Sequence, residues 1–451
     1  MRSLRWILGT VAVIVVVIVL VIAIGGAWLN TYIHSVAFKT EVESRAAQSL
    51  GGTVQIGQVD FNVFSGVKIQ DLDADVNAAH SGGQGALKVK VANVNCTYAW
   101  TELLSRRLKL TGLTLDQPQI ILTKEHVAPP PPQPRPGALD SGAVQGEGAA
   151  MPFQFILDRI KIKDGVVSVL DAAGSTMVNL QGVNVDANTS GYTSNKDVTG
   201  TLKIADITGT SNMHITGFST PFTFNTGGHF SASPFEASAY GGKLAGDYDF
   251  AMSPRMYSIL NLNGKGFDVT KLTEATTSNS SAKLTGTLDF QSKWRGVESG
   301  SLEGEGDAQI ADGKLEGVRI LDEISQVLKI KELHDPIIKK GKTHFVVRGR
   351  ETQLTGLQVE SSIFNLTGDG TVSFDGPLNM NLVLILTRDA MNKLPSQVAA
   401  SFVKQADGTG SIAFQVTGTT SNPQTNLPER LLLQNTQIQN VLNKALNKFF
   451  H

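Results

Sequence analysis

The sequence predicts a mainly β protein with one transmembrane helix at its N-terminus and a few amphipathic helices. Three observations lead to this fold class. An uncharged apolar run lies near the N-terminus, most of the remaining chain alternates apolar and polar residues, and glycine is abundant, with 45 of 451 residues. Alternation is typical of strands with one covered face. Glycine suits turns and bulges and weakens helices, so the composition favours many short strands.

The N-terminal segment 1–33 is predicted to cross a membrane. The stretch from Trp6 to Ile33 contains no charged side chain and consists mostly of Val, Ile, Leu, Ala and Gly. About 20 such residues in a helix span the bilayer core. Arg2 and Arg5 precede the run, and the next basic residue is Lys39. By the positive-inside rule, we expect the N-terminus in the cytoplasm and the rest of the chain outside it.

A cleaved signal peptide is the alternative interpretation of this segment. Gly25-Gly26-Ala27 resembles a small-residue cleavage site. Apolar regions of signal peptides run for about 7–15 residues, however, and this one is longer. The length therefore favours an uncleaved anchor.

Four sets of apolar residues recur at helical spacing. They are Phe38, Val42, Ala46 and Leu50; Leu321, Ile324 and Leu328; Met391, Leu394, Val398 and Phe402; and Ile438, Val441, Leu442, Ala445, Leu446 and Phe449. Pro395 falls inside the third set and predicts a kink or a break. The fourth set forms one apolar stripe, which we expect to cover an open end of the sheet.

The remaining exported chain is divided by a segment rich in proline and glycine. Residues 127–152 include Pro129-Pro130-Pro131-Pro132 and predict an extended linker, with a proline-rich ligand for a partner as the alternative. The predicted segments are 1–33 for a cytoplasmic stub and the anchor, 34–126 for a helix and strands, 127–152 for the linker, 153–427 for a β-rich region and 428–451 for a C-terminal amphipathic helix.

Composition and motifs give no indication of catalysis, a metal or a cofactor. The formal net charge is −1, from 39 basic and 40 acidic residues, so nucleic-acid binding is not favoured. Cys96 is the single cysteine, and the eight histidines lack the spacing of metal ligands. Catalytic groups can converge from distant positions, so a hydrolase acting on an envelope polymer stays an alternative.

Two acidic motifs have plain structural interpretations. Asp407-Gly408-Thr409-Gly410 resembles the Asp-Thr-Gly of aspartic proteases but has an extra glycine, so it predicts a turn. Asp71, Asp73 and Asp75 alternate as in a calcium loop but lack its glycine and distal glutamate. They predict a solvated strand face or a loop.

The order of several short motifs resembles the AsmA family of bacterial envelope proteins. The motifs are LGGTVQIG at 50–57, LLSRRLKL at 103–110, LTLDQPQI at 113–120, IADGKL at 310–315, GDGTV at 368–372 and VTGTTSNP at 416–423. They cover both ends and most of the chain, while residues 165–300 share only the general strand pattern. The order of the motifs carries the resemblance.

This resemblance implies a single-pass protein of the inner membrane whose bulk faces the periplasm. It also implies a long, curved antiparallel β-sheet with an apolar groove, in the style of bridge-like lipid-transfer proteins. The expected function is non-enzymatic support of phospholipid transport, lipid homeostasis and outer-membrane integrity, with membrane lipid and envelope proteins as partners. The main alternative is a scaffold or assembly factor for outer-membrane proteins. The family provides no catalytic residues to carry over.

The strands near the C-terminus supply candidate groove residues. Leu378, Met380, Leu382, Leu384 and Leu386 alternate along one strand and should share one face. Further candidates are Leu357, Val359, Leu366, Val372 and Phe374, and the helix expected at the groove end contributes Ile438, Val441, Leu442 and Leu446. The leucine face is either a groove lining or an ordinary packed core, and alternation alone does not separate the two.

Overall fold

A computed structural model of the protein forms two compact units, Met1–Ala232 and Ser233–His451. We describe each unit by itself. The residues that the structure describes are 36–62, 66–77, 86–103, 107–123, 154–189, 197–210, 212–225, 227–251, 256–276, 283–296, 302–317, 319–373, 376–419 and 422–432. The predicted anchor 1–33, the linker 127–152 and the C-terminal helix beyond residue 432 lie outside them.

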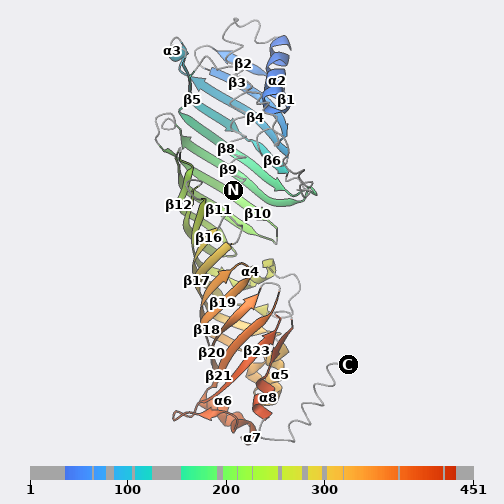
Figure 1. Ribbon diagram of the computed structural model, residues 1–451, viewed down its shortest axis with the longest axis vertical. Helices are drawn as coiled ribbons and strands as arrows, with labels where there is room; N and C mark the ends of the chain where they lie inside the picture. The colour runs from blue at the N-terminus through green and yellow to red at the C-terminus, as the bar shows by residue number, and fades with distance from the viewer. Residues whose placement is uncertain are drawn as a thin grey trace, which may run out of the picture. The chain divides into compact units, whose positions relative to one another are not determined.

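Unit 1 is a β-sheet with a helix on one face (Figure 1). Its described elements are α2 (Val36–Leu50), β1 (Gly52–Ile56), β2 (Val59–Asn62), β3 (Gly66–Asn77), β4 (Ala86–Tyr98), α3 (Trp100–Leu103), β5 (Arg107–Asp116), β6 (Gln119–Thr123), β7 (Gln154–Leu157), β8 (Arg159–Leu170), β9 (Thr176–Asn188), β10 (Val198–Gly209) and β11 (His214–Phe224). The next strand, β12 (His229–Ala239), contains the boundary between the units.

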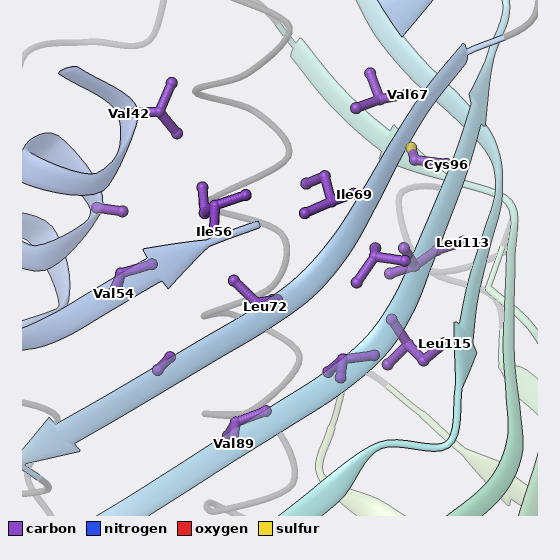
Figure 2. Close-up of a cluster of buried hydrophobic side chains, with 14 of the residues drawn as sticks. Val42, Val54, Ile56, Val67, Ile69, Leu72, Val89, Cys96, Leu113 and Leu115 are labelled. Carbon is purple, nitrogen blue, oxygen red and sulfur yellow. The ribbon is translucent and has the colours of Figure 1, made fainter. Parts of the chain in front are cut away.

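Helix α2 confirms the first helical pattern in the sequence. Gly51, at φ 65°, follows its last residue and ends the helix, as glycine commonly does. Val42 and Ala46 are one turn apart and fully buried against the inner residues of β1, β3 and β4. Figure 2 shows Val42 facing the same cluster as Ile56 and Ile69. This cluster is the packed core of unit 1.

The sheet of unit 1 is mixed. Strands β1 to β6 pair antiparallel, but β7 pairs parallel with β5, and β8 pairs parallel with both β5 and β6. Parallel neighbours need a long connection, whereas antiparallel neighbours need only a tight turn. The connection from β6 to β7 spans 124–153 and is long enough to bring the chain back in the same direction. Beyond it, β8 to β11 pair antiparallel in order.

The fold class predicted from the sequence is therefore wrong, although the chain is mainly β as expected. The sheet is mixed rather than antiparallel, because β7 and β8 run parallel to β5 and β6. Over the described ranges, from Val36 to Leu432, no helix is both long and apolar enough to cross a membrane. The described helices are short and pack against strands, and the longest of them is α2.

Unit 2 is formed by β-strands and several short helices (Figure 1). Its elements are β13 (Gly242–Ala251), β14 (Tyr257–Asp268), α4 (Val269–Thr276), β15 (Lys283–Leu284), β16 (Thr287–Gly296), β17 (Leu302–Glu316), α5 (Arg319–Leu328), η3 (Lys331–Leu333), β18 (Ile337–Arg348), β19 (Glu351–Ser361), β20 (Phe364–Ser373), β21 (Leu378–Leu386), α6 (Arg388–Lys393), α7 (Ser396–Ala399), β22 (Val403–Lys404), β23 (Gly410–Gly418), β24 (Pro423–Thr425) and α8 (Leu427–Leu432).

The short helices confirm two further sequence patterns. Ile324 and Leu328 form the buried side of α5. The third pattern breaks at Leu394-Pro395 into α6 and α7, because proline cannot donate the backbone hydrogen bond that would continue the helix. The Thr387 hydroxyl accepts a hydrogen bond from the Ala390 backbone N–H and caps the start of α6.

A β-bulge in β19 bends the sheet at Gly356. The register shifts between Leu354 and Leu357, and Gly356 takes φ 61° while its N–H donates to the Asp369 carboxylate over 2.7 Å. An added Cβ at this position would contact nothing within 4 Å. A side chain at position 356 would therefore meet no steric clash. It would lower the stability only because the backbone has a positive φ there.

We expect Gly356→Ala to lower the free energy of unfolding by about 1 kcal/mol, because alanine disfavours positive φ. Chemical denaturation of the variant measures this cost. The matched control is Gln358→Ala, an exposed position on the same strand, which should change stability little. Equal stability of Gly356→Ala and wild type would contradict the bulge geometry.

Candidate functional site

The sheet of unit 2 has one apolar face. The registers of β13, β14, β16 to β21 and β23 place the alternate apolar residues of successive strands opposite one another. The large residues on this face are Leu244, Tyr248, Phe250, Leu260, Leu262, Phe267, Leu288, Phe290, Trp294, Leu302, Ile310, Ile338, Phe345, Val347, Leu354, Leu357, Val359, Phe364, Leu366, Val372, Leu378, Met380, Leu382, Leu384, Leu386, Ile412, Phe414 and Val416. The positions between them carry Gly, Ala, Ser or Thr, so the face has no charged side chain at these positions.

The opposite face of the same sheet is mainly polar and charged, although Val346, Val383 and Ile385 also lie on it. Glu303 lies opposite Arg295 on one side and Arg348 on the other, and Glu305 lies opposite Lys293. His344 Nδ1 lies 3.0 Å from the Asp307 carboxylate. Opposite charges on facing strands stabilise the pairing modestly and keep this face in water. The sheet thus separates an apolar side from a solvated side.

Among the described residues, five short helices pack on the part of the apolar face around β21. Residues of α5, η3, α6, α7 and α8 join one buried cluster with the leucine row of β21, and Figure 1 shows these helices together at the end near β21. Leu386 is 0% exposed and Leu384 is 5% exposed beneath them. Leu354, Leu357 and Val372 are only half-buried. The face therefore changes along its length from packed core to partly exposed surface.

The predicted groove residues of the strands lie together on this face. Met380, Leu382, Leu384 and Leu386 are buried in the cluster, and Leu357, Val359, Leu366, Val372 and Leu378 are half-buried against it. Phe374 lies outside the described residues, and so do Ile438, Val441, Leu442 and Leu446 of the predicted groove-end helix. The described candidates therefore lie on one face of the sheet. Along β21, Leu386 lies in the packed core, and Leu378 at the other end of the strand is half-buried.

Between the strands of this region lies a pocket of about 520 Å³. It is lined by the middle of β19, β20, β21 and β23 and by Arg430 of α8, and its lining includes Leu357, Leu382 and Phe414 of the apolar face together with Asp369 and Gln415. The Leu382 side chain fills the space above Gly368, since a Cβ added at this glycine would lie 2.8 Å from Leu382 Cδ2. The pocket is mixed in polarity rather than a dry cavity.

Unit 1 repeats the same arrangement within itself. The cluster beneath α2 is fully buried, whereas the apolar residues that continue across β8 to β11 are mostly half-buried, among them Ile162, Val185, Leu202 and Phe218.

Salt bridges lie on the solvated side of these strands. The Arg159 guanidinium donates two hydrogen bonds to Asp186 and holds the pKa of that carboxyl below its usual range.

The two acidic motifs have the structures that their spacing predicted. Asp407 accepts hydrogen bonds from the Thr409 N–H at 2.9 Å and from its hydroxyl at 2.7 Å, which lowers the pKa of the carboxyl in a tight turn. Asp73 lies 2.8 Å from Lys90, and Asp75 lies 3.9 Å from Lys88, on the exposed side of β3. Within the described residues, no three His, Cys, Asp or Glu side chains are grouped to hold a metal ion.

One recurrent feature of the apolar face was not predicted from the sequence. Many glycines lie inside strands, directly opposite an aromatic residue of the next strand, such as Gly264 opposite Phe290 and Gly304 opposite Trp294. The abundance of glycine predicted turns and bulges instead. The alternation Gly304-Glu305-Gly306, which places both glycines on the apolar face, was the available signal.

No family model, curated protein or solved structure matches the chain. The resemblance to the AsmA family therefore stays a prediction, and the functional argument rests on the two sheet faces.

Proposed function

We propose that the protein binds the acyl chains of membrane phospholipids on the apolar face of its β-sheet and supports lipid transport without enzymatic chemistry. The observation that carries this proposal is the apolar face of unit 2, which has no charged side chain at its paired positions and is half-buried beyond the helix-covered end. The opposite face is charged, so only one side of the sheet suits an apolar ligand.

The chemistry of this face favours an acyl chain over an extended peptide. A peptide laid across it would bury backbone N–H and C=O groups, and the face offers few partners for them, namely some Ser and Thr hydroxyls and the Tyr248 hydroxyl. An acyl chain has no such groups, and its burial gains about 0.8 kcal/mol per methylene. The proposed location is the periplasmic side of the inner membrane, where phospholipid is the available ligand.

A pair of photo-crosslinking residues on β19 tests this function in the full-length chain. Leu354 is half-buried on the apolar face, and the neighbouring Gln353 is exposed on the polar face. We expect crosslinking in cells to attach phospholipid at position 354 and none at 353, as measured by mass spectrometry of the purified protein. The two variants carry the crosslinker on the same strand and are expressed and purified in the same way. They differ only in the face of the sheet on which the crosslinker lies.

Two outcomes would contradict the proposal. Equal lipid capture at 353 and 354 would indicate contact with bulk membrane rather than binding on one face. Capture of folded proteins at 354, without lipid, would favour the scaffold for outer-membrane protein assembly.

A further inference from the structure

Two aromatic rings in unit 2 occupy the space above glycines of the neighbouring strand. A Cβ added at Gly264 would lie 2.2 Å from Phe290 Cε1, and a Cβ added at Gly304 would lie 2.3 Å from Trp294 Cε3. For both glycines, the three nearest atoms belong to the ring alone. Each ring therefore lies low against the next strand, where any side chain would collide with it.

The surrounding contacts hold these rings in place. The Trp294 indole N–H donates to the Ser292 hydroxyl over 2.9 Å, which satisfies the only polar group of the ring. The ring centroids of Phe290 and Phe267 are 5.3 Å apart, and those of Trp294 and Phe345 are 6.4 Å apart. The four rings form two pairs on the apolar face, here called the ring layer. The indole N–H of Trp294 already has a partner, so a ligand need not satisfy it.

We propose that Gly264 and Gly304 set the clearance above this ring layer, so that a straight acyl chain can lie across it. The inference rests on the proposed lipid function and names its specificity-determining positions. A methyl group at either glycine forces the ring away from the sheet and into the space above the face. Phe290 and Trp294 then obstruct the chain that they otherwise contact.

Titration with a phosphatidylcholine carrying a pyrene-labelled acyl chain tests this proposal in the full-length protein. Gly304→Ala is expected to weaken binding about tenfold, within the range that overpacking produces. The double variant Gly304→Ala with Trp294→Leu should restore it, because the raised ring is gone. Glu305→Ala, the next residue on the polar face, is the matched control and should bind as wild type does.

Each result decides between the two proposals. A wild-type chain that takes up no pyrene lipid overturns the proposed function. A wild-type chain that binds, with Gly304→Ala binding equally well, overturns the clearance role alone. Weak binding that Trp294→Leu does not rescue also overturns it, because the ring would then not be the obstacle.

A second pair and a second measurement cover the case in which Gly304→Ala does not fold. Gly264→Ala, with Phe290→Leu as its rescue, repeats the test on β14 and β16.

Independently, Trp294 becomes the sole tryptophan when Trp6, Trp28 and Trp100 are replaced by phenylalanine. Phosphatidylcholine with brominated acyl chains should quench its fluorescence, and absence of quenching overturns the proposal whatever the variants do.

Discussion

Replacing Leu386 with aspartate is expected to unfold the sheet of unit 2. Leu386 is 0% exposed and packs under the helices at the end of the leucine row. An aspartate there removes the packing of a leucine and buries a carboxylate without a partner, at a cost of about 4 kcal/mol or more. The free energy of unfolding of a domain is about 5–15 kcal/mol, so this cost removes a large share of it or all of it. Circular dichroism during chemical denaturation measures the loss.

Leu378→Asp on the same strand and face provides the contrast. Leu378 is half-buried at the other end of the row, so water can reach a carboxylate there. We expect this variant to fold and to carry less lipid. Asn379→Asp, exposed on the polar face, is the control for the added charge. Equal destabilisation by Leu378→Asp and Leu386→Asp would show that the whole leucine face is packed core.

The sequence could predict the elements that depend on local patterns. The spacing of Val42 and Ala46 predicted α2, and Pro395 predicted the break between α6 and α7, because both effects act within one or two turns of helix. The strand alternation also predicted that Leu378 to Leu386 share a face. These features need no knowledge of distant partners.

The features that depend on distant partners could not be predicted in this way. The parallel pairing of β8 with β5 and β6 follows from where the chain returns after the segment 127–152, which its composition does not specify. Whether Leu386 lies in a core depends on α5 to α8, which pack over it from other parts of the chain. The same limit applies to Gly304, whose role depends on Trp294 of another strand.

Alkaline pH is expected to destabilise unit 1 through Cys96. This side chain is 1% exposed in the core beneath α2, and burial raises the pKa of its thiol from 9.0 to about 12. Below pH 9 the thiol is protonated in both the folded and the unfolded chain, so its contribution is fully present. Between pH 9 and 12 only the unfolded chain releases the proton, so stability falls as pH rises.

The expected loss is about 1.4 kcal/mol per pH unit, or on the order of 3 kcal/mol by pH 11. Cys96→Val removes the titrating group and keeps a side chain of similar size, so it is the matched control. The difference in free energy of unfolding between wild type and Cys96→Val, measured by urea denaturation from pH 7 to 11, should shift in favour of the variant only above pH 9. Tyr98, whose pKa is also raised by burial, titrates in both proteins, and the subtraction reduces its contribution. A difference that stays constant across this range would mean that the thiol is accessible to water in the folded chain.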